Sequence, residues 1–222
     1  MERIYIYGSI GWDIDAQYMR LALEEAEGDI ELRINSGGGD VFEGQAIYSL
    51  LEDYRKRNSA RIIVHVDALA ASIASIIAMA GDEIIMSDGA LLMIHQPWTP
   101  ESAGNAAELR ETAEVLDKVA ETLVTIYENR TGLDRSTIVS LMDEETWLTA
   151  SEAISFGFAD TLASESDVTA ASIKMFNYIN APNWIAAIDE QVKAPEKQAK
   201  ARRSIAAARL ALSRCCNKPL KH

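Results

Sequence analysis

The stretch ALAASIASIIAMAG, residues 68–81, is an apolar run that carries two hydroxyl groups, Ser72 and Ser75, one helical turn apart. A helix that spans a membrane needs about 20 consecutive apolar residues. This run is shorter and is flanked by Asp67 and Asp82, so it predicts a buried helix in a soluble protein. The run therefore indicates a globular fold.

Segments with the patterns of strands and helices alternate on both sides of this run. Two-residue alternation or short apolar runs predict strands at 4–7, 30–34, 61–66, 83–86 and 91–95. Helical spacing predicts helices over DAQYMRLALEEAEGD (15–29) and GQAIYSLLEDYRKR (44–57). Strands that alternate with helices indicate an α/β domain with a largely parallel sheet.

The composition limits the classes of function. With 222 residues, of which 48% are hydrophobic and 25% charged, the chain can form one full-sized core with an appendage. A formal net charge of −13 argues against nucleic-acid binding, which needs a basic surface. The N-terminus MERIYIYGSI lacks the apolar region of a signal peptide, so we expect a cytoplasmic protein.

No cofactor or metal is predicted. Cys215 and Cys216 are adjacent, and His65, His95 and His222 lack the spacing of metal ligands. The glycine-rich stretch INSGGGDVFEG (34–44) has neither the terminal Lys-Ser/Thr pair of a Walker loop nor the GxGxxG spacing of a dinucleotide fold.

One long helix is predicted over residues 105–130, with an acidic face and Gly132 at its end. Its apolar residues recur at near-heptad spacing: Leu109, Leu116, Leu123 and Tyr127, with Ala113 and Ala120 between them. A narrow stripe of this kind packs either against a partner chain or against the protein's own sheet, and both interpretations stay open.

The character of the sequence changes beyond Asp160. Residues 193–222 contain nine Lys or Arg and one acid, a formal charge of +8, which leaves −21 on residues 1–192. We therefore expect a main domain over 1–165 and a C-terminal extension over 166–222 that contains a basic helical arm. The arm is either an interaction segment or a solvated helix without a specific partner.

Four features supply the parts of acyl transfer, in chain order. The glycine turn at 37–39 offers backbone N–H groups to a negative oxygen. Ser72 lies at the start of a helix, and His95 ends an apolar strand before a proline, where it suits a general base. Acids in MDEETWLTASEAISFGFAD (142–160) are candidates to orient the histidine. Each feature alone has a structural explanation, and Ser75 fits a helical serine bonded to a backbone carbonyl. Together, however, they are the oxyanion donors, nucleophile, base and orienting acid that acyl transfer needs.

These residues resemble the Clp protease proteolytic subunit family over roughly residues 1–165. INSGGGDVFEGQAIY resembles its INSPGG turn, ALAASIASIIAMAG its GQAASMG nucleophile segment, LLMIHQPW its MIHQP strand, and ETWLTASEAISFGFAD its acid-bearing segment. The resemblance implies the Clp protease/crotonase-like α/β fold of repeated β-β-α units, with residues 105–130 as a long protruding helix.

The resemblance also implies the roles of particular residues. Ser72 matches the nucleophile and His95 the base, while Gly38 and Ile73 match the residues whose N–H groups form the oxyanion hole. Glu145 falls where the family has its acid when TWLT is aligned without gaps, and Asp143 is the alternative.

The expected function is that of a serine endopeptidase acting on protein or peptide substrates. The family implies a homo-oligomer, a heptameric ring or a double ring, with the long helix at the ring–ring contact. TWLTASEA looks closer to the phage and prophage branch of the family, and this resemblance implies a role in capsid maturation with scaffold or capsid proteins as partners. The chain starts almost at the first strand, so a partner ATPase is not expected.

Other functions stay open. A general Clp proteolytic subunit would work with an ATPase. A crotonase-like acyl-CoA enzyme would use the glycine turn without a nucleophile, and a non-catalytic assembly protein would keep only the fold. Departures from the family pattern include Gly37 in place of its proline and Ala74 in place of a glycine.

Overall fold

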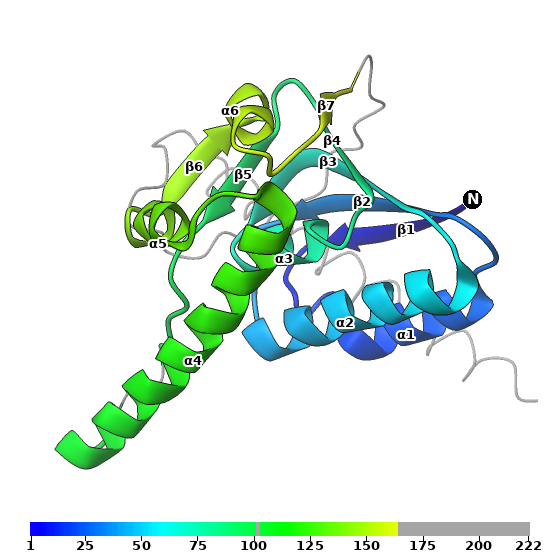
Figure 1. Cartoon of the computed structure of the whole chain (residues 1–222). Helices are drawn as coiled ribbons and strands as arrows, with labels where there is room; N and C mark the ends of the chain where they lie inside the picture. The colour runs from blue at the N-terminus through cyan, green and yellow to red at the C-terminus, as the bar shows by residue number, and fades with distance from the viewer. Residues whose placement is uncertain (101–102, 164–222) are drawn as a thin grey trace, which may run out of the picture. The chain divides into compact units, whose positions relative to one another are not determined.

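The computed structural model describes residues 1–100 and 103–163 (Figure 1). In chain order, its elements are β1 (Glu2–Tyr7), α1 (Ala16–Glu25), β2 (Ile30–Ser36), α2 (Val41–Asn58), β3 (Ile62–Ala71), α3 (Ile73–Ala78), β4 (Glu83–Met86), β5 (Leu91–Ile94), α4 (Ala106–Thr131), α5 (Arg135–Asp143), β6 (Thr146–Thr149), α6 (Ala150–Ser155) and β7 (Thr161–Leu162).

The strands form one largely parallel sheet, which confirms the predicted α/β class. Its main order is β1-β2-β3-β4-β7, with every neighbouring pair parallel. The C-terminal half of β3 diverges from this path and pairs in parallel with β5, which in turn pairs antiparallel with β6. β3 therefore belongs to two branches of the sheet, and its C-terminal end lies beside β5.

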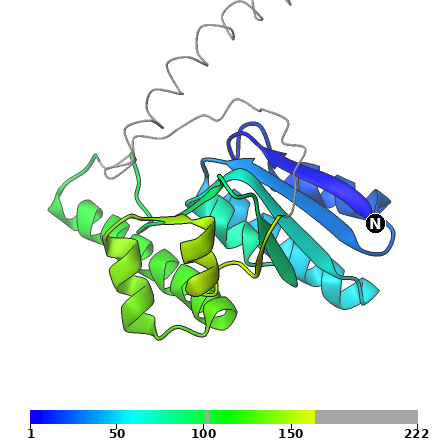
Figure 2. The same cartoon turned by 90° about the horizontal axis from the view of Figure 1, so that it is seen from above.

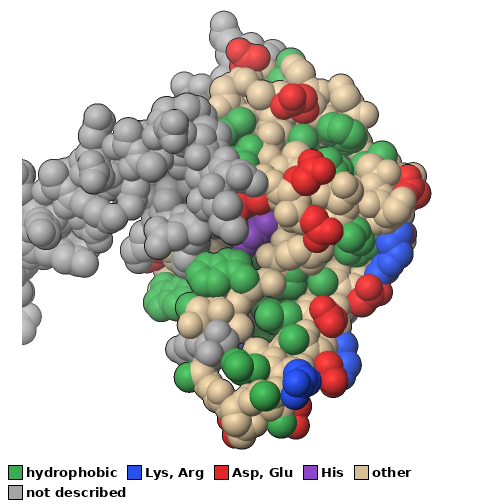
Figure 3. All heavy atoms as spheres, turned by 90° about the vertical axis from the view of Figure 1, so that its left-hand side faces the viewer, with side chains coloured by type: hydrophobic (Ala, Val, Ile, Leu, Met, Phe, Trp, Pro, Cys, Tyr) green, Lys and Arg blue, Asp and Glu red, His purple; other side chains and the backbone are tan. Residues whose placement is uncertain are grey.

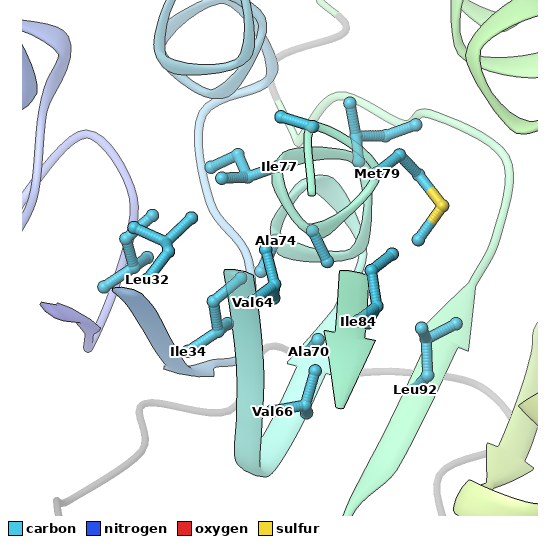
Figure 4. Close-up of a cluster of buried hydrophobic side chains, with 14 of the residues drawn as sticks. Leu32, Ile34, Val64, Val66, Ala70, Ala74, Ile77, Met79, Ile84 and Leu92 are labelled. Carbon is cyan, nitrogen blue, oxygen red and sulfur yellow. The ribbon is translucent and has the colours of Figure 1, made fainter. Parts of the chain in front are cut away.

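The core lies between the sheet and the helices on one of its faces. α1 and α2 lie side by side along that face (Figures 1 and 2), and α2 contacts α3. Alternate strand residues point into this layer. Figure 4 shows the strand residues Leu32, Val64 and Ile84 in one cluster with Ala74 and Ile77 of α3. The short helix α3 is buried throughout, so its first residue is fixed by packing on all sides.

The run 68–81 is only partly helical, which corrects the sequence interpretation. Residues 68–71 continue β3, and the helix covers only Ile73–Ala78. A strand buried on both faces loses the two-residue alternation that identifies strands, so its alanines could not be told from the start of a helix. The consequence is a strand-to-helix turn at Ser72.

The long helix was predicted correctly, and its two halves lie in different surroundings. α4 begins at an Asn105 capping box with Glu108 and ends at Gly132 in the left-handed conformation. Its C-terminal half contributes Leu123 and Tyr127 to the core, whereas residues 106–111 are exposed throughout. Figure 1 shows this N-terminal half extending away from the sheet. α5, which the sequence patterns did not indicate, connects α4 to β6.

Two expectations concern residues beyond those that the structure describes. The boundary near residue 165 and the basic arm within 166–222 lie outside the described residues and stay predictions. In the described residues, no helix combines the length and the apolarity that crossing a membrane would require.

Candidate active site

Three strand ends bring the predicted site residues to one edge of the sheet. β3 and β5 are parallel, with Ala71 opposite Met93, so the residues that follow both strands emerge on the same side. β5 and β6 are antiparallel, with Ile94 opposite Thr146, so the residue before β6 lies near the residue after β5. Directly opposed residues in such a pair are separated by about 5 Å. This register brings Ser72, His95 and Glu145 together from three distant segments.

Ser72 occupies the turn between β3 and α3 in a strained conformation. Its φ and ψ are 56° and −130°, a region that residues with a Cβ seldom adopt, and its N–H donates to the carbonyl of Met93 at 2.9 Å. The turn places the hydroxyl 2.8 Å from Nε2 of His95. A strained serine on a sharp strand-to-helix turn is the arrangement that exposes a nucleophile.

His95 is half-buried, and its surroundings favour the neutral imidazole. Burial lowers the pKa of His95 below its ordinary value of 6.5, and the negative charge of Glu145 acts in the opposite direction to a smaller extent. A neutral ring accepts a proton at Nε2 when Ser72 attacks a carbonyl, so His95 is in the protonation state that a general base requires at neutral pH.

The two candidate acids, Glu145 and Asp143, differ in burial and in hydrogen-bond partners. Glu145 is 8% exposed, and its negative charge partly offsets the lowering of the His95 pKa by burial. Trp147 holds it in place by donating from Nε1 to its Oε1 at 3.2 Å. Asp143 is exposed and accepts a hydrogen bond from Nε2 of Gln96 at 2.8 Å. The geometry therefore favours Glu145 as the partner of the imidazole.

The backbone of Glu145 is also unusual. Its φ is 48°, in the left-handed region just after the end of α5, where Gly or Asn is the common choice. A glutamate there bears a conformational cost that glycine would avoid, and such strain concentrates at functional positions.

The glycine turn packs directly against the nucleophile. A Cβ built on Gly38 would lie 2.8 Å from both the Cβ of Ser72 and the carbonyl oxygen of Ala71, so only glycine allows this approach. The turn is held by Ile10, which donates to Gly38 O at 2.9 Å and accepts from Asp40 N at 3.0 Å. Gly38 has a φ of 93°, which glycine adopts without strain.

The N–H groups near Ser72 have different hydrogen-bonding states. The N–H of Gly38 donates to Oγ of Ser36 at 3.1 Å. The N–H of Ile73 is the first of α3, and within residues 1–100 and 103–163 it has no acceptor. The N–H of Gly39, whose φ is 151°, likewise has none in that part of the chain. Ile73 and the glycine turn therefore present donors beside the nucleophile.

Ser75 does not share the environment of Ser72. It is fully buried, and its hydroxyl donates to the carbonyl of Ser72 at 2.6 Å, which confirms the prediction of a helical serine bonded to the backbone. It also lies 2.7 Å from the hydroxyl of Tyr127.

Three contributors were not anticipated from the sequence. Trp147 lies two residues after Glu145, and the same-face rule for strands could have linked them. Ser36 precedes the glycine turn. Tyr127 is 52 positions from Ser75, and no local pattern signals such a contact. In the part of the chain that the structure describes, no group of three His, Cys, Asp or Glu side chains is arranged to hold a metal ion.

Two comparisons relate this chain to known proteins. The family profile described as Clp protease matches residues 2–166. The ATP-dependent Clp protease proteolytic subunit of Dioscorea elephantipes is 34% identical to this chain over 151 residues, which covers 67% of this chain and 72% of that protein. The parallel sheet with its covering helices is consistent with the Clp/crotonase-like fold.

Proposed function

Because this chain belongs to the Clp protease family and is a serine peptidase, we propose that Ser72, His95 and Glu145 form its catalytic triad. The observation that carries the proposal is the 2.8 Å contact between Ser72 Oγ and His95 Nε2, made by a strained serine at a strand-to-helix turn. The activity is cleavage within peptide chains, by way of an acyl-enzyme on Ser72.

The chemistry follows from the contacts. Ser72 Oγ attacks the scissile carbonyl carbon, and its proton passes to Nε2 of His95. His95 then donates that proton to the leaving amine, which breaks the peptide bond and leaves an ester on Ser72. A water molecule, deprotonated by His95, hydrolyses the ester. Glu145 stabilises the imidazolium that forms in both steps, because its negative charge lies beside the ring.

The oxyanion would be received by backbone N–H groups on both sides of Ser72. Ile73 is proposed as one donor, since its N–H has no acceptor among the described residues and follows the nucleophile directly. The glycine turn supplies the other. Gly38 is the residue expected from the sequence, and its N–H would bond the oxyanion in addition to Ser36 Oγ or in place of it. One residue further, the N–H of Gly39 has no acceptor within residues 1–100 and 103–163. Each donor is worth roughly 3 to 4 kcal/mol of barrier where it has been measured elsewhere.

Labelling with a fluorophosphonate tests the nucleophile. We expect one covalent adduct per chain, on Ser72, and no peptide hydrolysis by Ser72→Ala. Ser49→Ala is the matched control, because Ser49 is a helical serine whose hydroxyl donates to the carbonyl of Gln45 at 2.9 Å. An unlabelled wild-type protein would favour the crotonase-like or non-catalytic alternative, and hydrolysis by Ser72→Ala at the wild-type rate would overturn the assignment.

The exposed half of α4 supports assembly with further copies of this chain. Leu109 is 41% exposed, although it belongs to the apolar stripe whose continuation at Leu123 is buried. Val115, in the same half of α4, is 49% exposed. Figure 3 shows hydrophobic side chains exposed among charged ones on the face that lies to the left in Figure 1. We propose that α4 pairs with α4 of another copy and that the protein forms a heptameric ring or double ring.

We propose a cytoplasmic phage or prophage peptidase that matures capsids by cleaving scaffold and head proteins. The resemblance of TWLTASEA to the phage and prophage branch supports this role. The +8 charge of residues 193–222 supports binding to an acidic scaffold protein. The alternative is a proteolytic subunit that works with an ATPase, and the Dioscorea relative is named an ATP-dependent Clp protease proteolytic subunit.

The two roles differ in their requirement for ATP. A capsid-maturation peptidase cleaves its protein substrate with no nucleotide and no second protein. Purified protein that cleaves short peptides, but degrades proteins only when an ATPase and ATP are added, would favour the alternative.

A further inference from the structure

A hydrogen-bonded chain runs from α4 to the back of the nucleophile turn. Tyr127 on α4 is 2% exposed and Ser75 on α3 is fully buried, with their hydroxyl oxygens 2.7 Å apart. Ser75 Oγ is 2.6 Å from the carbonyl oxygen of Ser72, which only accepts. A serine hydroxyl has one proton. Because Ser75 donates it to Ser72, the hydroxyl of Tyr127 donates to Ser75.

The carbonyl at the end of this chain shares a peptide group with a proposed oxyanion donor. The C=O of Ser72 and the N–H of Ile73 belong to one planar peptide, and no peptide bond in the described residues is cis. In a trans peptide, the C=O and the N–H point in opposite directions. Fixing the carbonyl of Ser72 on the buried side therefore fixes the direction of the Ile73 N–H on the other side.

Two donors hold this carbonyl. The N–H of Ser75 donates to Ser72 O at 3.0 Å, and the hydroxyl of Ser75 donates to the same oxygen at 2.6 Å. Ser72 is strained, with a φ of 56°, and a strained residue persists only when its surroundings determine it strongly. Hydrogen bonds in a chain also polarise one another, so donation to the carbonyl makes the N–H of the same peptide a better donor.

We propose that Ser75 and Tyr127 are positioning residues, which aim and polarise the Ile73 N–H toward the oxyanion by holding the carbonyl of Ser72. The inference rests on the proposed function. The structural alternative is a helical serine with an ordinary backbone bond and a buried tyrosine that needs a partner. That alternative predicts an effect on stability alone, whereas positioning predicts an effect on the chemical step.

The test compares Ser75→Ala and Tyr127→Phe with the wild type. For Ser75→Ala we expect kcat to fall about tenfold with KM within about twofold, because an oxyanion donor acts in the transition state. A peptide boronic acid, which places an oxygen in the oxyanion position, should bind about tenfold more weakly, while a product peptide should bind unchanged. Tyr127→Phe should lower kcat by a smaller factor and have no further effect in the Ser75→Ala background.

Matched controls separate this role from general effects on folding. Ser49→Ala removes a helical serine bond on α2, and Tyr54→Phe removes a buried tyrosine hydroxyl that donates to Gly28 O at 2.8 Å. Both controls should keep the wild-type kcat, and thermal unfolding followed by circular dichroism establishes that each variant is folded.

The outcomes are distinct. A wild-type kcat in folded Ser75→Ala, an equal loss in the Tyr54→Phe control, or additive losses in the double variant would each overturn the inference. Failure of the proposed function looks different, because Ser72→Ala would then retain activity or the wild type would show none.

Discussion

Replacing Gly38 by alanine tests the packing of the glycine turn against the nucleophile. The added Cβ would lie 2.8 Å from Ser72 Cβ and from Ala71 O. Optimal separation of nonbonded heavy atoms is about 3.5 Å or more, so these atoms must separate by roughly 0.7 Å. Both neighbours belong to the backbone or lie next to it, and they cannot swing aside as the end of a flexible side chain would.

Gly28→Ala is the matched control for the effect of φ. Gly28 has a φ of 73° and Gly38 a φ of 93°, so an alanine at either position pays a similar conformational cost, about 1 to 2 kcal/mol. A Cβ on Gly28 would have nothing within 4 Å. The steric clash is thus confined to Gly38→Ala and should lower its free energy of unfolding by about a further 1 to 3 kcal/mol.

The effect on catalysis should be larger still. Displacement of a reacting group by about 1 Å costs on the order of 100-fold in rate. We therefore expect kcat/KM of Gly38→Ala to fall by tens-fold to about 100-fold, while Gly28→Ala keeps the wild-type value. Urea unfolding gives the free energies, and a fluorogenic peptide gives kcat/KM at a temperature where all three proteins are folded. If Gly38→Ala matched Gly28→Ala in both measurements, the reasoning about this contact would be wrong.

Further predictions concern the acid, the base and the assembly. Glu145→Gln should lower kcat/KM by about 10²-fold or more, as loss of a triad acid does elsewhere. Asp143→Asn should keep kcat/KM near the wild-type value, because Asp143 is exposed and bonded to Gln96. Equal losses in the two variants would refute the choice of acid. Since neutral His95 is the active form and burial lowers its pKa, kcat/KM should be full at neutral pH and fall only as the pH drops through a value below 6.5. Glu145→Gln should move this acidic limb to lower pH, because it removes the charge that raises the pKa; a shift to higher pH would contradict that. Val115→Glu should shift the protein to smaller species in sedimentation velocity, and an unchanged assembly would exclude this half of α4 from the contact.

Much of the architecture was predictable because its signals are local. Period-two and helical patterns located most strands and helices, and the capping residues of α4 follow general rules. The parallel sheet followed from the alternation of strands with helices. The apolar run 68–81 was misjudged in its first four residues, because a doubly buried strand and a buried helix look alike in composition.

The sequence by itself determined which chemical groups are present, and it located Ser72 at the start of a helix, His95 at the end of a strand and the acids before an extended segment. It did not determine their register. Only the pairing of β3 with β5 and of β5 with β6 places a hydroxyl 2.8 Å from an imidazole. Burial and hydrogen-bond partners then distinguish Glu145 from Asp143. The contact between Tyr127 and Ser75 joins residues 52 positions apart. Periodicity reports on neighbours along one element, whereas these distances depend on how separate elements pack, and that is decided by the free energy of the whole core.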